Sequence, residues 1–191
     1  MWRSDASAST SGTSGANPNV DAFAHLVDVF NRHAVRFVVI GVAGANHYAR
    51  SGGTVFTTQD FDLFLPPDSE NALRSWSACE TAGLQLFCGD EPLDRPRDAF
   101  LARAIVSRRA LVRATDGAGL DVDLTLVMAG FEFEAVWAER RLFTVDGIGV
   151  PVARLTHIVQ SKAAAGRPKD RLFLASHEEA LRDLIESLDA P

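Results

Sequence analysis

Two short acidic segments have residue types and a spacing that could do chemistry. In Asp60-Phe61-Asp62, two carboxylates are separated by a single residue. On a β-strand, side chains at i and i+2 leave the same face of the sheet. Both carboxylates therefore project together, and two acids side by side repel unless a cation lies between them. Leu63 and Leu65 share the opposite face with Phe61, which predicts an apolar side that holds the strand.

Residues 120–126, Leu-Asp-Val-Asp-Leu-Thr-Leu, repeat this construction, with Asp121 and Asp123 on one face. If this strand lies next to the first, three or four carboxylates meet on one surface of the sheet, which suits Mg²⁺ or Mn²⁺. Phosphoryl transfer uses such sites, because two ions about 3.5–4 Å apart can stabilise the attacking and leaving oxygens together.

An isolated Asp-x-Asp pair is more often the polar face of a half-exposed sheet than a site. Two such strands, the first preceded by another strand and a Gly-containing turn, favour the functional interpretation. The earlier strand is Arg36-Phe37-Val38-Val39-Ile40, a β-branched and aromatic run that stops at Gly41. The order of the segments therefore matters as much as the acids.

The hydrophobic pattern predicts that an α+β fold positions these segments, as a small mixed β-sheet with flanking helices. Predicted helices cover about residues 20–33, 42–49, 69–79, 131–139, 156–165 and 169–188, and Asp68 or Ser69 is predicted to cap the third of them. Predicted strands cover residues 36–40, 60–65, 84–87 at an edge, 105–115, 120–127, 142–145 and 148–152, and residues 88–99 form a loop. The last four strands make two hairpins, around Asp116-Gly117 and Asp146-Gly147. Trp76 and Trp137 fall on apolar helix faces and are predicted to be core.

Length and composition bound the organisation of the chain. It has 191 residues, of which 47% are hydrophobic and 23% charged, the balance of an ordinary globular protein. We expect residues 20–191 to form a single domain and residues 1–19 to be a flexible tail. No apolar run approaches the roughly 20 residues of a membrane-spanning helix. Only two cysteines and no zinc-like spacing favour a reducing cytoplasm and a metal held by oxygen.

Charge leaves the kind of partner open. The formal net charge of −6 argues weakly against a protein whose main task is to grip a phosphate backbone. Two local segments are nonetheless basic, one with Arg103, Arg108, Arg109 and Arg113, the other with Lys162, Arg167, Lys169 and Arg171. Such runs are more often solvated faces than sites, so composition alone does not decide between the two.

The chain resembles the nucleotidyltransferases of the polymerase-beta superfamily in three segments, Val39-Ile40-Gly41, Thr58-Gln59-Asp60-Phe61-Asp62-Leu63 and Val122-Asp123-Leu124. The superfamily pattern is a strand ending in Gly followed by Gly or Ser, an Asp-x-Asp on the next strand, and a third acid on a later strand. Residues 162–170, Lys-Ala-Ala-Ala-Gly-Arg-Pro-Lys-Asp, look like a C-terminal signature of small bacterial members. These members include AbiEii-like toxins and lincosamide-type adenylyltransferases.

The resemblance implies a nucleotidyltransferase-like fold that moves a nucleoside monophosphate, AMP by analogy, from a nucleoside triphosphate to a hydroxyl and releases pyrophosphate. It implies that Asp60 and Asp62 bind Mg²⁺ or Mn²⁺ and that Asp123, rather than Asp121, is the third acid, which helps to activate the attacking hydroxyl. The residues implied to contact the nucleotide are Gly41, Gly44, Thr58, Lys162, Arg167 and Lys169. The acceptor would be a small molecule, a tRNA end or a protein, all of which relatives use.

One position departs from the superfamily pattern. Val42 follows Gly41 directly, where the superfamily usually has Gly or Ser, and Gly44 comes two positions later. Val offers no hydroxyl to a phosphate, and its branched Cβ resists the conformations that Gly permits. Nucleotide binding would then be weakened, shifted to Gly44, or lost. If it is lost, the chain would be a degenerate member that acts through a protein partner, such as the antitoxin of a toxin–antitoxin pair.

Simpler explanations stay open for several of these residues. Lys162 and Arg167 could complement the C-terminal end of their own helix, where the macrodipole favours cations. Asp170 could cap the last helix or pair with Lys169. A structural α+β domain, whose acids only solvate one face of the sheet, is the remaining alternative.

Overall fold

The structure is a computed structural model that describes residues 18–49, 55–58 and 60–189. The strands in this part of the chain are β1 (Val38–Ile40), β2 (Asp60–Phe64), β3 (Gln85–Cys88), β4 (Glu91–Pro92), β5 (Val112–Thr115), β6 (Asp121–Thr125), β7 (Arg141–Val145) and β8 (Ile148–Val152). They form one mixed sheet in the order β4-β3-β5-β6-β2-β1-β8-β7. The predicted α+β class with a mixed sheet is confirmed.

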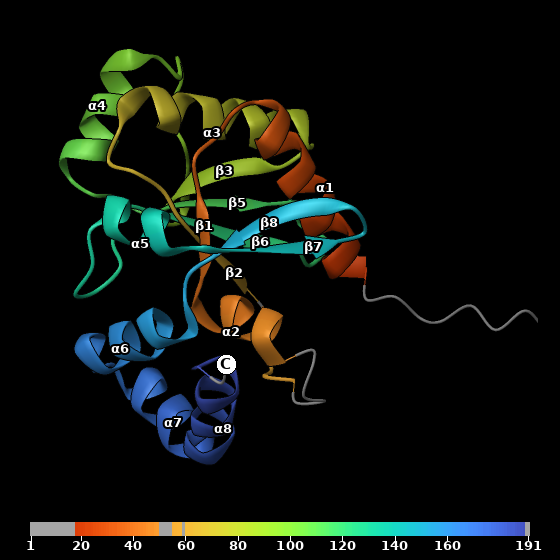
Figure 1. The fold of residues 1–191 in the computed structure, drawn as a ribbon. Helices are drawn as coiled ribbons and strands as arrows, with labels where there is room; N and C mark the ends of the chain where they lie inside the picture. Colours follow the sequence, from red (N-terminus) through yellow and green to blue (C-terminus); the bar gives the residue numbers. More distant parts are fainter. Residues whose placement is uncertain (1–17, 50–54, 59, 190–191) are drawn as a thin grey trace, which may run out of the picture.

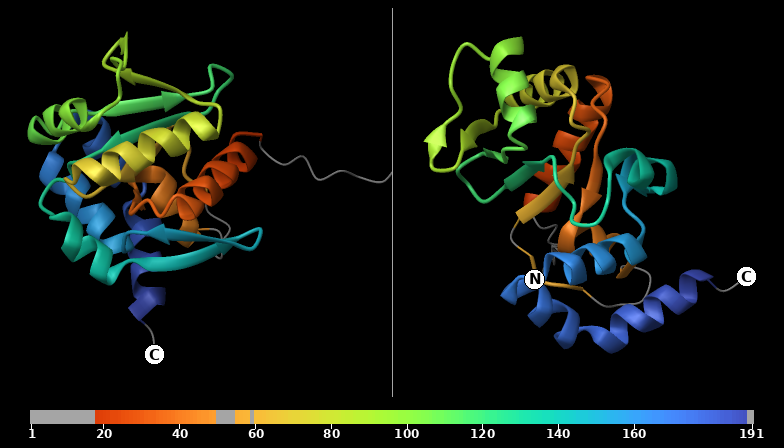
Figure 2. Two further views of the ribbon diagram at one scale, coloured as in Figure 1. Left: turned by 90° about the horizontal axis from the view of Figure 1, so that it is seen from above. Right: turned by 90° about the vertical axis from the view of Figure 1, so that its left-hand side faces the viewer.

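Helices cover both faces of this sheet. They are α1 (Pro18–Arg32), α2 (Gly41–Ala49), α3 (Ser69–Thr81), α4 (Ala99–Ser107), α5 (Phe133–Glu139), α6 (Leu155–Ala165), α7 (Pro168–Ser176) and α8 (Glu178–Asp189). Figure 1 shows α3 and α4 on one side of the sheet, with α6, α7 and α8 gathered beyond α2. The two further views in Figure 2 keep α6, α7 and α8 together as a C-terminal group.

The alternation of apolar residues along the strands explains the two layers. Val39, Leu63 and Val122 belong to the larger core cluster, which also contains Phe30 of α1 and Trp76 of α3. On the opposite face, a smaller cluster gathers Val38, Ile40 and Phe64 with residues of α5 and α6. The apolar side predicted for the acidic strands is therefore confirmed, and its acid side is partly covered as well.

Local signals at several element ends act as predicted. The Asp68 carboxylate accepts a hydrogen bond from the Asn71 backbone N–H at 2.6 Å and caps α3. Asp146 and Gly147 have φ of 51° and 80°, the left-handed pair that a tight two-residue hairpin requires. The β7–β8 hairpin predicted around these residues is confirmed.

One strand prediction and one helix prediction need correction. Residues 105–107 are not strand, because α4 runs from Ala99 to Ser107 and only Val112–Thr115 pairs in the sheet. Asp98 starts α4 by accepting hydrogen bonds from the backbone N–H groups of Phe100 and Leu101. The predicted last helix 169–188 is two helices, since His177 leaves helical geometry with φ of −124° between α7 and α8.

Two smaller expectations also change. The strand predicted at the edge, β3, has the two-residue β4 paired outside it, within the predicted loop 88–99. Of the predicted tail 1–19, only Pro18 and Asn19 lie within the described residues, where they begin α1. Among the described residues, no helix has both the length and the apolar composition needed to cross a membrane.

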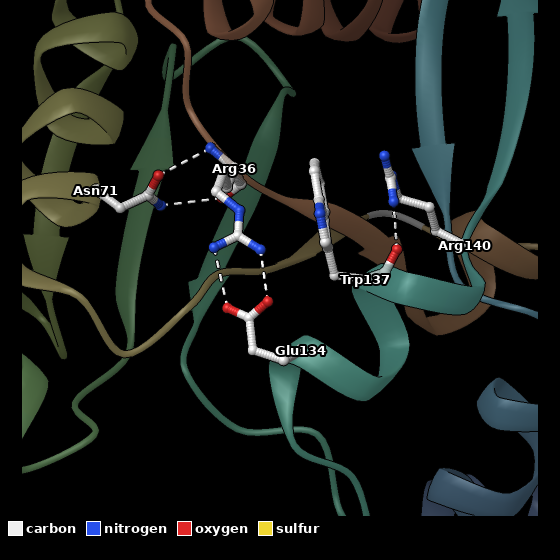
Figure 3. Close-up of polar contacts among 5 residues, drawn as sticks. All are labelled: Arg36, Asn71, Glu134, Trp137 and Arg140. Atoms are coloured by element: carbon white, nitrogen blue, oxygen red, sulfur yellow. Dashed lines mark hydrogen bonds and ion pairs between the residues drawn. The ribbon is translucent and has the colours of Figure 1, made fainter.

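A polar and aromatic cluster fixes the start of β1 (Figure 3). The Arg36 guanidinium donates to both Glu134 oxygens, at 3.0 and 2.7 Å. The Asn71 amide exchanges hydrogen bonds with the Arg36 backbone. Trp137, predicted to be core, is instead partly exposed and lies between the guanidinium groups of Arg36 and Arg140, 4.8 and 3.7 Å from its ring centroid. These contacts tie α3 and α5 to the strand that leads into Gly41.

Candidate functional site

The two acidic strands lie side by side in the middle of the sheet. β2 and β6 pair in parallel, with Asp60 opposite Asp121 and Asp62 opposite Asp123. Neighbouring strands are about 4.8 Å apart and side chains in register leave the same face. All four carboxylates therefore share one surface, which satisfies the condition on which the metal-site hypothesis depended.

Asp62 is the acid most affected by this crowding. Burial, and after it the nearby charges of Asp123 and Asp60, raise the pKa of its carboxyl from 3.8 to about 6. Lys162 and Lys169 act in the opposite direction. The ionised carboxylate is thus under-compensated by the protein, which is the electrostatic condition that a bound cation would relieve.

Gly41 lies directly against Asp62, where β1 turns into α2. Its φ of +65° is in the left-handed region, and an ideal Cβ at this position would overlap the Asp62 carboxylate. Glycine is therefore required here both for its backbone conformation and for the close approach. The turn at Gly41, which was predicted to approach a nucleotide phosphate, packs its backbone against the Asp62 side chain.

A cleft of about 400 Å³ opens between these acids and the C-terminal helices. Asp62, Asp123 and Gly41 line one side of it. The predicted cations Lys162, Arg167 and Lys169, which come from α6 and the start of α7, also line it. Residues separated by up to 130 positions in the sequence, from Ile40 to Asp170, thus meet around one cavity.

Three predicted site residues do not line this cleft. Asp60 lies one pleat away from Asp62 on the same face. Thr58 donates a hydrogen bond to the Asp60 carbonyl at 3.1 Å and faces a separate hollow of about 350 Å³ beside α1. Gly44 is buried, and an ideal Cβ there would lie 3.0 Å from both Ile158 Cδ1 and the Val39 carbonyl oxygen. Gly44 therefore allows α2 to pack against β1 and α6. A phosphate cannot reach this buried position.

Arg113, which stood out in the sequence only as part of a basic run, does not line the cleft but contacts Asp123, which does. It lies opposite Asp123 in the β5–β6 hairpin, and its Nε and Nη2 donate to the two Asp123 carboxylate oxygens at 2.7 and 3.0 Å. The hydrogen bond that the guanidinium donates to Asp123 raises the pKa of Arg113 above its ordinary value. A two-residue turn at Asp116-Gly117 would pair Arg113 with Leu120, so only the longer loop 116–120 of the structure places Arg113 opposite Asp123.

Lys162 is held by an ion pair inside the C-terminal helices. Its Nζ lies 2.9 Å from Asp170 Oδ1, and the two side chains are only 14% and 7% exposed. The ammonium also lies 4.9 Å from the centroid of the Phe173 ring. Asp170 thus pairs with Lys162 rather than with Lys169, and it fixes this cation at the cleft.

The side-chain oxygens of the three predicted metal ligands decide whether a divalent cation fits this site. Asp60, Asp62 and Asp123 offer carboxylate oxygens only, which are the ligands that Mg²⁺ and Mn²⁺ prefer. Within residues 18–49, 55–58 and 60–189, no three Asp, Glu, His or Cys side chains are grouped as a metal site. In this conformation both Asp123 oxygens accept from Arg113. The chemistry of the donors fits the ion, and the position of Arg113 decides how many are free.

Comparison with known proteins adds no identification. No model of a protein family matches the sequence, and no curated protein matches it.

Proposed function

We propose that this chain is a metal-dependent nucleotidyltransferase with a nucleotidyltransferase-like fold. The observation that carries the proposal is the in-register pairing of Asp62 with Asp123 across β2 and β6, facing lysine and arginine side chains in one cleft. Acids on one wall suit a divalent cation, and cations on the other suit the phosphates of a nucleoside triphosphate. A volume of about 400 Å³ falls in the usual range of small-molecule sites.

The proposed reaction moves a nucleoside monophosphate, AMP by the resemblance noted above, to a hydroxyl acceptor. The acceptor oxygen forms a bond to the α-phosphorus, the bond from that phosphorus to the oxygen bridging to the β-phosphate breaks, and pyrophosphate leaves. Mg²⁺ or Mn²⁺, held by Asp60, Asp62 and Asp123, would supply charge stabilisation to the entering and leaving oxygens. Positioning and electrostatics account for most of the rate in such transfers.

The protein's own groups have separate roles in this proposal. Asp123 orients the acceptor hydroxyl and takes its proton. Lys169 and Arg167 neutralise the β- and γ-phosphates. Lys162, which Asp170 holds in place, lies between the phosphates and the acidic side chains. The acceptor is a small molecule, a tRNA end or a protein, and the net charge of −6 favours the first or the last.

Thermal melting with each of the four nucleoside triphosphates, with and without Mg²⁺, tests the proposal on wild type and Asp62→Asn. Ligand that binds only the folded state raises the melting temperature by mass action. We expect a Mg²⁺-dependent rise with at least one nucleotide, ATP first, that disappears in the variant. A wild-type melting temperature unchanged by every nucleotide would contradict the proposal.

A second candidate is a degenerate member that has lost turnover and acts through a protein partner of the antitoxin kind. Two observations favour it: Val42 follows Gly41, and Arg113 occupies both oxygens of Asp123. This alternative predicts no nucleotide-dependent change in melting temperature and a tight complex with the product of a neighbouring gene. The melting experiment therefore separates the two candidates.

A further inference from the structure

Arg113 extends the row of acids across the sheet. In successive strands β5, β6 and β2, Arg113 pairs with Asp123 and Asp123 pairs with Asp62. The charges along this row are therefore positive, negative and negative on one face. The guanidinium lies at the end of the row, on the side of Asp123 away from Asp62.

The contact between Arg113 and Asp123 uses the atoms that a metal would need. Nε to Oδ1 and Nη2 to Oδ2 are 2.7 and 3.0 Å, so the guanidinium engages both oxygens of the carboxylate. Bidentate pairs of this kind are among the strong hydrogen bonds of proteins. A divalent cation binds through the same oxygens, so a direct metal–Asp123 bond requires the guanidinium to move or let go of one oxygen.

The two partners differ in their freedom to move. The Asp123 side chain is 12% exposed and is fixed in the centre of the sheet, whereas the Arg113 side chain is 43% exposed. The arginine is thus the member of the pair that can swing toward solvent. Arg109, which lines the cleft, makes no ion pair within the described part of the chain.

We propose that Arg113 is a positioning residue that competes with the divalent cation for Asp123, and that a bound nucleoside triphosphate releases Asp123 by giving the guanidinium a phosphate to bind. This inference rests on the proposed function. Phosphate oxygens accept the same bidentate geometry as a carboxylate, so the exchange replaces one strong pair by another. The cation then binds at Asp123 after the nucleotide rather than before it.

Mn²⁺ binding measured by electron paramagnetic resonance tests this order of binding without any turnover. The titrations use wild type, Arg113→Met, Arg113→Lys and Arg109→Met, each with and without a non-hydrolysable ATP analogue. We expect Arg113→Met to bind Mn²⁺ without nucleotide about tenfold more tightly than wild type, within the usual range of coupling between two ligands. The gain in Mn²⁺ affinity caused by the analogue should shrink by the same factor.

The other variants separate competition from general electrostatics. Arg109→Met removes one positive charge from the lining of the cleft itself. We expect it to change nucleotide-free Mn²⁺ affinity by less than about threefold, since a charge without direct contact is screened by water and salt. Arg113→Lys keeps the charge but not the bidentate fork, and its affinity should fall between wild type and Arg113→Met. It also serves as the second variant if Arg113→Met does not fold.

The possible failures are distinguishable. If wild type binds Mn²⁺ with the analogue, but neither Arg113 variant gains affinity without it, the competition is overturned while the proposed function stands. If Arg109→Met gains as much as Arg113→Met, the effect is bulk charge and the inference is wrong. If wild type and Asp62→Asn are alike and neither binds Mn²⁺ even with the analogue, the proposed function fails and the inference fails with it.

Discussion

The Asp62 carboxyl binds its proton more tightly in the folded chain than in the unfolded chain. Burial and the neighbouring acids raise its pKa from 3.8 to about 6. Because the folded-state pKa is the higher one, this group favours folding fully below about pH 4, and that contribution is lost as pH rises through 6. At pH 7.5 the ionised carboxylate lowers the metal-free stability by at most about 3 kcal/mol, since each pKa unit corresponds to about 1.4 kcal/mol.

Asp62→Asn should therefore increase the free energy of unfolding of the metal-free protein at pH 7.5, by about 1–3 kcal/mol. The difference from wild type should narrow steadily as pH falls toward 4.5, because wild-type Asp62 then becomes neutral too. Urea unfolding of both proteins at several pH values between 4.5 and 7.5 measures this. A difference in unfolding free energy that does not change with pH would mean that burial and the neighbouring acids do not raise the pKa of Asp62.

Gly41 allows a comparison with a second glycine of nearly the same backbone conformation. Gly41 and Gly89 have φ of 65° and 63°, but a Cβ at Gly89 would meet nothing within 4 Å, whereas one at Gly41 would overlap Asp62. Both alanine variants should lose about 1 kcal/mol for the left-handed conformation. Only Gly41→Ala should lose more than that, and only it should abolish the Mg²⁺-nucleotide shift in melting temperature.

At the scale of elements, the pair Lys162–Asp170 joins α6 to α7. Removing one partner of a buried pair leaves an uncompensated charge, so Lys162→Met or Asp170→Asn should each cost about 3 kcal/mol of unfolding free energy. The double variant should recover much of that loss. The exposed pair Arg182–Glu178 on α8, with side chains 59% and 74% exposed, is the control, and its cycle should give less than about 0.5 kcal/mol. Equal coupling energies in the two cycles would contradict this assignment.

The elements themselves were largely predictable, because local chemistry determines where they begin and end. Apolar alternation marked the acidic strands, and Asp68 and Asp146-Gly147 marked a helix start and a hairpin turn correctly. Helix α4 was missed because Ile105 and Val106 are β-branched, and that signal outweighed the Asp98 cap and the alanines before it. The break at His177 was missed because the helical spacing continues through it.

The partners of the site residues were harder to predict, because they depend on packing between distant segments. The parallel pairing of β2 with β6 follows from topology, which periodicity alone does not specify. Whether Gly44 faces a phosphate or a core depends on Ile158 of α6, more than a hundred residues away in the chain. Arg113 was missed because its pairing with Asp123 depends on the loop 116–120, which is longer than the expected turn. A basic run in an acidic protein also gave no reason to single it out.

The whole molecule has a net negative charge, the same sign as its proposed ligand. A chain of net charge −6 repels a nucleoside triphosphate at long range, so binding depends on the local cations at the cleft. Exposed charges are screened over about 10 Å at 0.1 M salt. We therefore expect the affinity for the Mg²⁺-nucleotide complex to fall as salt rises, because the attraction at the cleft is screened.

Lys169→Gln should weaken nucleotide binding by about fivefold at low salt and flatten its salt dependence. Arg171→Gln is the matched control, since Arg171 is also exposed on α7 but does not line the cleft. Its effect should stay below about twofold. Calorimetric titration at 50 and 300 mM salt measures both variants, and identical losses would remove Lys169 from the proposed phosphate side.

The parallel pairing of strands distant in sequence also has a consequence for folding. Asp62 meets Asp123 only when β6 docks beside β2, and Val39 of β1 pairs with Val152 of β8. Contacts between such distant segments close large loops and slow the search for the native topology. During synthesis, the strand that carries Asp60 and Asp62 therefore cannot pair with β6 until the first 125 residues of the chain have emerged. The acids of β2 and those of β6 are therefore kept apart until late in folding. The repulsion between them arises together with the cleft in which a cation can offset it.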